Sequence, residues 1–342
     1  MRLLICIQAV DLDDPLMGFF HRWLEEAAKQ FPLITVLALR VGRYDLPANV
    51  RIIPLRPASS HSRFAVIQTL IKQAWIRRHD YDAVFVRGDP QYIILATWLW
   101  RLLGKRIVFW YAHWKVRASA VWASRLANIT VTSVKTAFDH PSVKAIPIGQ
   151  NVDHRRFVLR TAPTASPVRC LAFGSVRPIK RIDLAIKAFL EADGENLGST
   201  LAIVGPRTDK TYEETLKALA QGHPSIQWGE AVAYDQVPAL LADYDLTINA
   251  CPGSLDKVII EAMMSGQIVI ASTDGILGWL PERLHWLYAP QLDDLVRAVR
   301  RALALTPQER FVLGNELRAL AIEQHSLEGQ VRKLVILLEK KV

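Results

Sequence analysis

The chain has 342 residues, of which 51% are hydrophobic and 22% are charged, and its formal net charge is +9. This length favours two α/β domains over one, and the composition excludes a disordered chain. The excess of positive charge indicates an anionic partner, which could be a nucleotide, a phospholipid surface or a nucleic acid. No run of about 18 apolar residues occurs, so we expect no segment to span a bilayer.

The cysteines and the first residues bear on the compartment. Cys6, Cys170 and Cys251 are odd in number and far apart, which fits neither a disulfide framework nor a zinc site. We therefore expect the protein in the cytoplasm, with peripheral attachment to the inner face of the cell membrane as an open alternative. Residues 1–10 resemble a short signal peptide but lack a cleavage-like ending, and residues 3–7 are better interpreted as a first buried strand.

Strands and helices alternate through the first half. This alternation predicts a Rossmann-like fold of parallel strands connected by helices, although the glycine-rich dinucleotide fingerprint is missing. The acidic loop 11–14 lacks the spaced glycine and the final glutamate of a calcium loop, so we expect no metal there. Ser133 is placed to cap a short helix. The expected strands are residues 3–7, 34–39, 83–86, 106–110, 129–132 and 145–148, and the expected helices are 19–29, 63–78, 92–103 and 118–126.

Helix 63–78 is basic and amphipathic, with Phe64, Ile67, Ile71 and Trp75 at helical spacing. Two interpretations are open. The apolar stripe packs on the sheet and the charges are solvated, or the helix lies against anionic lipid. Helix 92–103 carries two tryptophans and is too short to cross a membrane, so core packing is expected for it.

His113 follows strand 106–110. A side chain at the carboxyl end of a parallel strand lies at the ligand-binding edge of an α/β sheet. A purely structural histidine is the alternative.

The second half repeats this alternation of strands and helices after a polar linker at residues 161–167. We expect a first domain at residues 1–160, a second domain at 161–325, and a helix at 326–342 that packs back on the first domain. The expected strands are 169–173, 201–204, 226–228, 245–249 and 268–271, and the expected helices are those ending at 190, 212–220, 235–242, 258–264 and 327–338.

One candidate loop follows strand 169–173. Gly174 allows the backbone to approach a ligand, and Arg177, Lys180 and Arg181 surround the start of the next helix. Cations beside free backbone N–H groups make an anion site. The alternative is a solvated basic turn.

A second candidate loop follows strand 245–249. Pro252 and Gly253 break the chain, helix 258–264 follows, and Gly266 is placed to end that helix. The helix start suits a phosphate, and Glu261, one turn later, could reach hydroxyls of the same ligand. Alternatively, Glu261 faces solvent.

Together these segments resemble the family 4 glycosyltransferases of the GT-B fold, in which two Rossmann-like domains face each other across a crevice. Phe173-Gly-Ser-Val-Arg-Pro-Ile-Lys180-Arg-Ile-Asp183 resembles the donor motif of that family, and residues 252–266 resemble its acidic motif. Ile146-Pro-Ile-Gly-Gln-Asn-Val-Asp153 is similar to its boundary element, and the strand ending in His113 to its active-site histidine segment.

The chain also departs from the family pattern. Gly253 stands where the acidic motif usually opens with Glu, and Ser175 stands where the donor motif usually has Arg. Asp256 could supply the missing carboxylate, and Arg177 could supply the guanidinium hydrogen-bond donors that the missing Arg would provide. Gly18 is the one glycine that remains of the usual pair in the first loop.

The resemblance implies a retaining transfer of a sugar from a UDP- or GDP-linked donor to an acceptor hydroxyl, in the synthesis of cell-surface polysaccharide or glycolipid. His113, Lys180 and Glu261 are implied as catalytic residues, no metal or other cofactor is expected, and the acceptor would be a glycan or a lipid-linked molecule. The further residues implied in donor binding are Gly18, Gly174, Ser175, Arg177, Gly253, Ser254, Leu255, Asp256 and Lys257.

Other functions make different demands on the sequence. Gly253 and Ser175 favour, as the main alternative, an inactive sugar-nucleotide- or glycan-binding protein of the same fold. An epimerase would need additional acidic or basic groups, and a pyridoxal-linked phosphorylase would need a cofactor lysine motif that is missing. The positive charge is scattered and no nucleic-acid-binding motif occurs, so we expect no nucleic-acid partner.

Overall fold

The computed structural model describes residues 1–14, 17–56, 62–113, 115–165, 167–192, 194–253 and 255–340. The chain forms two compact units. The first consists of Met1–Asn151 with Leu327–Val342, and the second of Val152–Ser326. Residues 152–160 and the segment expected as a linker therefore group with the second unit.

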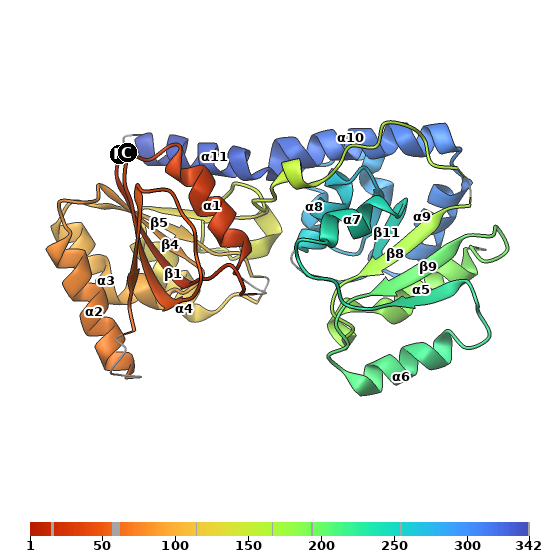
Figure 1. Ribbon diagram of the computed structural model, residues 1–342, viewed down its shortest axis with the longest axis horizontal. Helices are drawn as coiled ribbons and strands as arrows, with labels where there is room; N and C mark the ends of the chain where they lie inside the picture. Colours follow the sequence, from red (N-terminus) through yellow and green to blue (C-terminus); the bar gives the residue numbers. More distant parts are fainter. Residues whose placement is uncertain are drawn as a thin grey trace. The chain divides into compact units, whose positions relative to one another are not determined.

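The first unit is built on one parallel seven-stranded sheet with the strand order β3-β2-β1-β4-β5-β6-β7 (Figure 1). Its strands alternate their side chains between two cores: Leu3, Ile5 and Ile7 of β1 enter one, whereas Leu4 and Cys6 enter the other. The strands are β1 (Leu3–Val10), β2 (Ile34–Val41), β3 (Val50–Pro54), β4 (Ala83–Arg87), β5 (Arg106–Trp110), β6 (Ile129–Thr132) and β7 (Ala145–Pro147).

Helices cover both faces of this sheet. One core contains apolar residues of α1 (Phe19–Ala28) and α11 (Leu327–Glu339). The other contains residues of α2 (Arg63–Ile76), α3 (Gln91–Leu102) and α4 (Ala118–Leu126). Contacts between α2 and α3 and between α3 and α4 make these three helices one continuous layer.

The C-terminal helix α11 is part of the first unit, although residues 152–326 separate it from the rest. Leu334 and Leu338 lie in the same core as Trp23 of α1. Gln330 accepts a hydrogen bond from the Trp23 indole at 2.9 Å and donates one to the Gly149 carbonyl at 2.7 Å. Figure 1 shows α11 beside α1.

The second unit contains a parallel five-stranded sheet with the order β10-β9-β8-β11-β12. Its helices form two groups, α5 with α6 and α9, and α8 with α7 and α10. The strands are β8 (Arg169–Phe173), β9 (Thr200–Val204), β10 (Ile226–Gly229), β11 (Leu246–Asn249) and β12 (Ile268–Ala271), and the helices are α5 (Ile182–Glu191), α6 (Lys210–Leu219), α7 (Val237–Ala242), α8 (Lys257–Met264), α9 (Leu292–Ala304) and α10 (Pro307–His325).

Both sheets reverse their winding direction once. In the first sheet the reversal lies between β1 and β4, and in the second it lies between β8 and β11. The loops that leave two such strands diverge to opposite sides of the sheet and open a crevice at its carboxyl edge. These two switch points are therefore where ligand-binding loops are expected.

The structure confirms the expected α/β class with two doubly wound sheets, and it corrects several local predictions. Strand β3 was not predicted. Ser133 caps no helix: the turn at Lys135–Phe138 starts after Val134, and the Ser133 hydroxyl is buried without a hydrogen-bond partner in the described chain. The apolar side of α2 that packs inward is the one with Leu70 and Ala74.

Three aromatic side chains of α2 and α3 face solvent. Phe64 is 66% exposed and Trp75 is 47% exposed, so, of the two interpretations left open for this helix, packing of the whole stripe on the sheet is wrong at both ends of α2. On α3, Trp100 is fully buried but Trp98 is 59% exposed. Helical periodicity identifies an apolar face, but it does not identify which of two apolar faces the sheet covers.

Helix α10 approaches the end of α8 through a glycine. A Cβ atom at Gly314 would lie 2.1 Å from the carbonyl oxygen of Gly266. Gly266 itself has a φ of +79° just beyond α8, as the sequence predicted for a helix-ending glycine. This contact holds α10 against the helix that carries Glu261.

We predict that Gly314→Ala destabilises the protein by about 1–3 kcal/mol, because the added methyl group forces the two helices apart. Helix propensity alone predicts the opposite sign, a gain of roughly 1 kcal/mol. Urea unfolding measures the difference. Val312→Ala, at an exposed position of the same helix, is the matched control, and a Gly314→Ala protein as stable as the control would contradict the close contact.

Candidate active site

The two loops singled out in the sequence lie at the switch point of the second sheet. The first leaves β8 and the second leaves β11, and these strands are hydrogen-bonded neighbours. Both loops start from the carboxyl edge of the sheet because all its pairings are parallel. The structure thus brings together residues that lie about 80 positions apart in the chain.

A pair of glycines lets the backbone crowd together at this edge. Gly174 has a φ of +138° and Gly205, after β9, has a φ of +146°. A Cβ atom at Gly205 would lie 2.1 Å from the Gly174 carbonyl oxygen, so this position excludes any side chain. At position 174 the backbone angle is what requires a glycine. A Cβ atom added there would lie 3.8 Å from Cε of Lys180.

Lys180 joins the two loops. Its Nζ lies 2.5 Å from Oδ2 of Asp256, and the lysine side chain is only 16% exposed. The Asn249 amide donates to the same carboxylate oxygen at 3.4 Å. Lys180 ends a short 3₁₀ turn, and Arg181 then takes a left-handed φ of +48° before α5 begins. This turn aims the ammonium group at the neighbouring loop.

Glu261 lies on α8, the helix that follows the second loop, and it is only 5% exposed. Among the described residues no group donates a hydrogen bond to its carboxylate. Burial raises the pKa of Glu261, while Lys257 and Arg156 oppose that rise and Asp256 adds to it. The interpretation of Glu261 as a solvent-facing residue is therefore wrong. A buried carboxylate without donors is suited to accept hydrogen bonds from a ligand.

Further positive charge surrounds these two groups. Arg177 is exposed on the first loop. Burial raises the pKa of Cys251 to about 11, and the positive charges of Lys180 and Arg177 oppose this rise. Arg156 stacks on Tyr234 with its guanidinium carbon 4.0 Å from the ring centroid, and it donates to the Tyr234 carbonyl at 2.6 Å.

Sequence reasoning missed Arg156 and Asn249. Arg156 lies on a short basic turn far from both motifs, and nothing in its local pattern points to Glu261. Asn249 was assigned only as the end of a strand. Its side chain accepts a hydrogen bond from the Cys251 N–H at 3.2 Å and so shapes the start of the loop. An asparagine at the carboxyl end of a central strand was the available signal for that residue.

The remaining predicted residues of this unit lie on the same two loops. Gly253 has a φ of +100°, and its carbonyl accepts a hydrogen bond from the Thr273 hydroxyl at 2.5 Å. Leu255 is buried, and Lys257 is the first residue of α8. Ser175 is partly exposed beside Gly174. Ser254 lies outside the described residues.

His113 belongs to the first unit, three residues after β5. Its side chain is exposed, and its Nδ1 accepts a hydrogen bond from the Lys115 N–H at 3.0 Å. That bond places the proton of the neutral ring on Nε2, which is then a hydrogen-bond donor.

Gly18, in the loop after β1, is required by its own loop. A Cβ atom there would lie 2.9 Å from the carbonyl oxygens of both Leu12 and Asp14. The Gly18 N–H donates to the Asp14 carbonyl at 2.8 Å. Space inside the loop is thus one sufficient reason for this glycine.

The acidic residues of that loop have protein partners. Asp13 pairs with Arg43 at 2.7 Å and Asp14 with Arg40 at 3.0 Å. Asp11 accepts hydrogen bonds from the backbone N–H groups of Asp13 and Arg43. Protein groups thus bind all three of these carboxylates.

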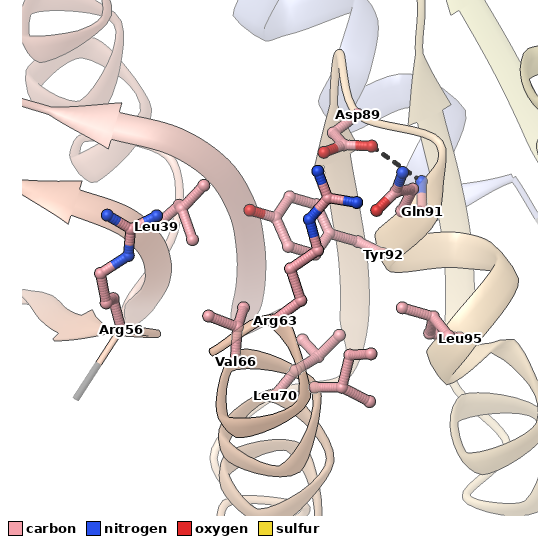
Figure 2. A pocket seen from close by; sticks show the side chains of 10 residues that line it. Leu39, Arg56, Arg63, Val66, Leu70, Asp89, Gln91, Tyr92 and Leu95 are labelled. Atoms are coloured by element: carbon pink, nitrogen blue, oxygen red, sulfur yellow. Dashed lines mark hydrogen bonds between the residues drawn. The ribbon is translucent and has the colours of Figure 1, made fainter. Parts of the chain in front are cut away.

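A cavity of about 390 Å³ lies in the first unit where α2 and α3 begin (Figure 2). Arg63 of α2 and the ring of Tyr92 point into it, and Arg56 lies on its far side. Asp89, which also lines it, accepts a hydrogen bond at 2.9 Å from the N–H of Gln91, the first residue of α3. The lining is mixed, with the apolar side chains Val66, Leu70 and Leu95 beside these polar groups.

One segment of the chain matches a known protein family. Residues 167–304, which contain both loops of the second switch point, match the family described as Glycosyl transferases group 1. The second unit of the chain is therefore similar to group 1 glycosyltransferases over residues 167–304. A comparison with curated proteins gave no match.

Solved structures match both units of the chain. HepE from Anabaena in complex with UDP and glucose has a TM-score of 0.71 and 15% identity, with 100% of both chains covered. A glycosyltransferase from Rickettsia africae has a TM-score of 0.74 and 13% identity over 99% of this chain and 98% of that one. The lipopolysaccharide outer core galactosyltransferase WaaB has a TM-score of 0.72 and 12% identity over 99% and 100%. These similarities establish the GT-B fold.

We predict that Glu261→Gln stabilises the ligand-free protein at pH 8. Folding raises the pKa of Glu261 above its ordinary value of 4.5. Ionising the buried carboxylate therefore costs stability once the pH rises above 4.5, and the full cost is present above the raised pKa. The variant removes this cost. Thermal unfolding at several pH values should show a higher melting temperature than wild type at pH 8 and none of this gain at pH 4.

Glu214→Gln, on the exposed side of α6, is the control for a change of charge alone. An equal gain in both variants would show that burial of Glu261 is not the cause.

Proposed function

We propose that the protein transfers a sugar from a nucleotide-sugar, UDP- or GDP-linked, to an acceptor hydroxyl with retention of the anomeric configuration. The observation that carries this proposal is Glu261, a buried carboxylate to which no described residue donates a hydrogen bond, within reach of the charges of Lys257 and Arg156. Such a carboxylate can accept hydrogen bonds from the two hydroxyls of a ribose, and cations one loop away can bind the diphosphate.

Charge develops on the diphosphate as the glycosidic bond breaks. Lys180 would neutralise it, with Arg177 supplying a second cation from the same loop. Preorganised positive charge at the leaving group lowers the barrier because no reorganisation is needed during the reaction. In the free protein Asp256 holds Lys180 in place, and the diphosphate would compete with that carboxylate for the ammonium group.

The other predicted residues complete this proposal. The loop at residues 253–257 would cover the donor sugar, with Asp256 as the carboxylate where the family pattern has Glu in place of Gly253. From the first unit, the Nε2–H of His113 would donate to a sugar hydroxyl, and Gly18 would allow its loop to approach the phosphates.

No metal takes part in this proposal. Lys180 and Arg177 supply the charge that a divalent cation supplies in other phosphate sites. Activity resistant to EDTA would agree with this.

Names of the structural neighbours support the choice of substrates. HepE has been solved with UDP and with UDP-glucose, which favours a UDP-linked donor. WaaG, at a TM-score of 0.60 and 14% identity, is described as involved in lipopolysaccharide biosynthesis, and WaaB as a lipopolysaccharide galactosyltransferase. We therefore propose a glycan or lipid-linked acceptor in the synthesis of cell-surface polysaccharide or glycolipid.

We further propose that the first unit docks on anionic membrane through the outer faces of α2, α3 and α4. No described helix is long and apolar enough to cross a bilayer. On α3, Ile94, Trp98 and Leu102 recur every four residues, so they form one stripe, with exposed fractions of 41%, 59% and 72%. Trp75 of α2 and Trp122 of α4, exposed on the neighbouring helices, extend it.

Charge favours lipid as the partner of this surface. The sequences of α2, α3 and α4 contain no Asp or Glu, but they carry Arg63, Lys72, Arg101 and Arg125. Tryptophan and arginine together suit the headgroup region of an anionic bilayer, where the rings enter the boundary and the cations meet phosphate.

The first test is a calorimetric titration of the full chain with UDP, UDP-glucose, GDP and GDP-mannose, with EDTA present. We predict that one nucleotide binds and that Lys180→Ala weakens it about tenfold to a hundredfold, the usual loss for a charged hydrogen bond. Glu261→Ala should weaken it similarly. Lys217→Ala, which breaks an exposed ion pair on α6, is the control.

The outcomes separate the competing functions. Binding with transfer, and a product glycoside with the configuration of the donor, supports the proposal. Nucleotide binding without transfer to any acceptor supports the inactive binding protein instead. If none of the four ligands binds the wild-type protein, the proposed donor site is wrong.

Membrane docking is tested by sedimentation with vesicles of phosphatidylcholine, with or without phosphatidylglycerol. We predict that phosphatidylglycerol promotes binding and that the double variant Trp98→Ser, Leu102→Ser binds at least about tenfold more weakly, because two large apolar side chains no longer enter the bilayer. Val312→Ser with Ile336→Ser, at exposed positions outside this surface, is the control. Equal binding by both double variants would refute the docking surface.

A further inference from the structure

Arg87 occupies the switch point of the first sheet. It is the last residue of β4, the strand that pairs with β1 on one side and β5 on the other. The loop after β1 leads to α1 at this edge, and Gly88, the next residue, is exposed with a φ of +84° and open space beside it. Arg87 is thus placed where an open α/β sheet binds ligands.

Three aromatic rings surround its guanidinium group. The guanidinium carbon lies 4.9 Å from the ring centroid of Trp110, its register partner on β5, and 5.3 Å from those of Phe19 and Phe20 at the start of α1. Trp110 and Phe20 are themselves buried in the core. The rings interact with the faces of the guanidinium and remove water from around it.

No acidic group compensates this charge. Arg87 makes no ion pair and no hydrogen bond with any residue that the structure describes, and its Nη1 is buried without an acceptor. Burial lowers the pKa of Arg87 to about 9, with no carboxylate opposing the change. By contrast Arg160, a shielded arginine of the second unit, lies 2.8 Å from Asp245.

Stacking alone leaves the donors of Arg87 unused. Cation–π contacts use the faces of the planar group, whereas its N–H bonds lie in the plane and require acceptors. A buried donor without an acceptor is costly, and an arginine fork matches the two oxygens of a phosphate or a carboxylate. A bound oxyanion would satisfy both the charge and the orphaned donor.

We propose that Arg87 anchors an oxyanion-binding site in the first unit, which takes a phosphate or carboxylate group of a substrate. Building on the proposed function, we assign this anion to the acceptor, because Lys180 and Arg177 already supply the positive charge proposed to compensate the donor diphosphate. The acceptor would then be an anionic molecule, such as a sugar or lipid that carries phosphate or carboxylate. The donor diphosphate is the other source of the same chemistry.

The test is a calorimetric titration of the full chain with inorganic phosphate, first alone and then with UDP at saturation. Arg87→Met keeps an apolar stem among the rings and removes the donors, and Arg87→Lys keeps the charge without the fork. Arg51→Met, which removes an exposed strand arginine 3.5 Å from Asp80, is the matched control. UDP affinity and melting temperature are measured for every variant.

We expect wild type and Arg51→Met to bind phosphate with equal affinity whether or not UDP is present. Arg87→Met should lose at least about tenfold in phosphate affinity, with Arg87→Lys in between, while UDP affinity is unchanged. If UDP displaces the phosphate and Arg87→Met weakens UDP, the site holds an oxyanion of the donor, and the assignment to the acceptor is overturned.

Unchanged phosphate and UDP affinities in Arg87→Met, with a lower melting temperature, would overturn the site. Arg87 would then have only a structural role, in packing against the aromatic core. Failure of the proposed donor site is separate: UDP would then bind no variant, and the phosphate titration without UDP would still report on Arg87.

Discussion

The ion pair between Lys180 and Asp256 is the interaction on which the second switch point depends. The two loops leave neighbouring strands and turn to opposite sides of the sheet, so nothing in the ladder of backbone hydrogen bonds holds them together. A shielded pair at 2.5 Å does so, and Asn249 supports it from the end of the strand. An incoming phosphate can replace the Asp256 carboxylate as the partner of Lys180, so the positive charge of the lysine stays compensated. An apolar contact could not be exchanged in this way.

Two ionisable side chains, the Glu261 carboxylate at the second switch point and the Arg87 guanidinium at the first, make no hydrogen bond in the part of the chain that the structure describes. A buried ionisable group without a hydrogen-bond partner costs free energy in the empty protein. In the proposals above, a bound ligand supplies the missing partner of each group. Stability lost in the empty state becomes affinity when the ligand arrives.

The fold could be predicted from the sequence because parallel strands are short apolar runs bounded by loops. Strands 106–110, 129–132, 169–173 and 268–271 were predicted with their observed bounds. The two loops of the second site were found by their glycines and cations, and topology then placed them together. Arg87 and Arg156 were not found, since an arginine at a strand end or in a turn has no local signature. Whether such a residue has a partner is a property of the tertiary structure.

The position of α11 has a consequence for the order in which the chain folds. The core of the first unit contains Leu327, Val331, Leu334 and Leu338 from the end of the chain beside Trp23 from its beginning. All of Val152–Ser326 is synthesised between them. On the ribosome the second unit can therefore complete its core while the first still lacks one helix of its own. The N-terminal half of this protein is the first to be made and the last to be finished.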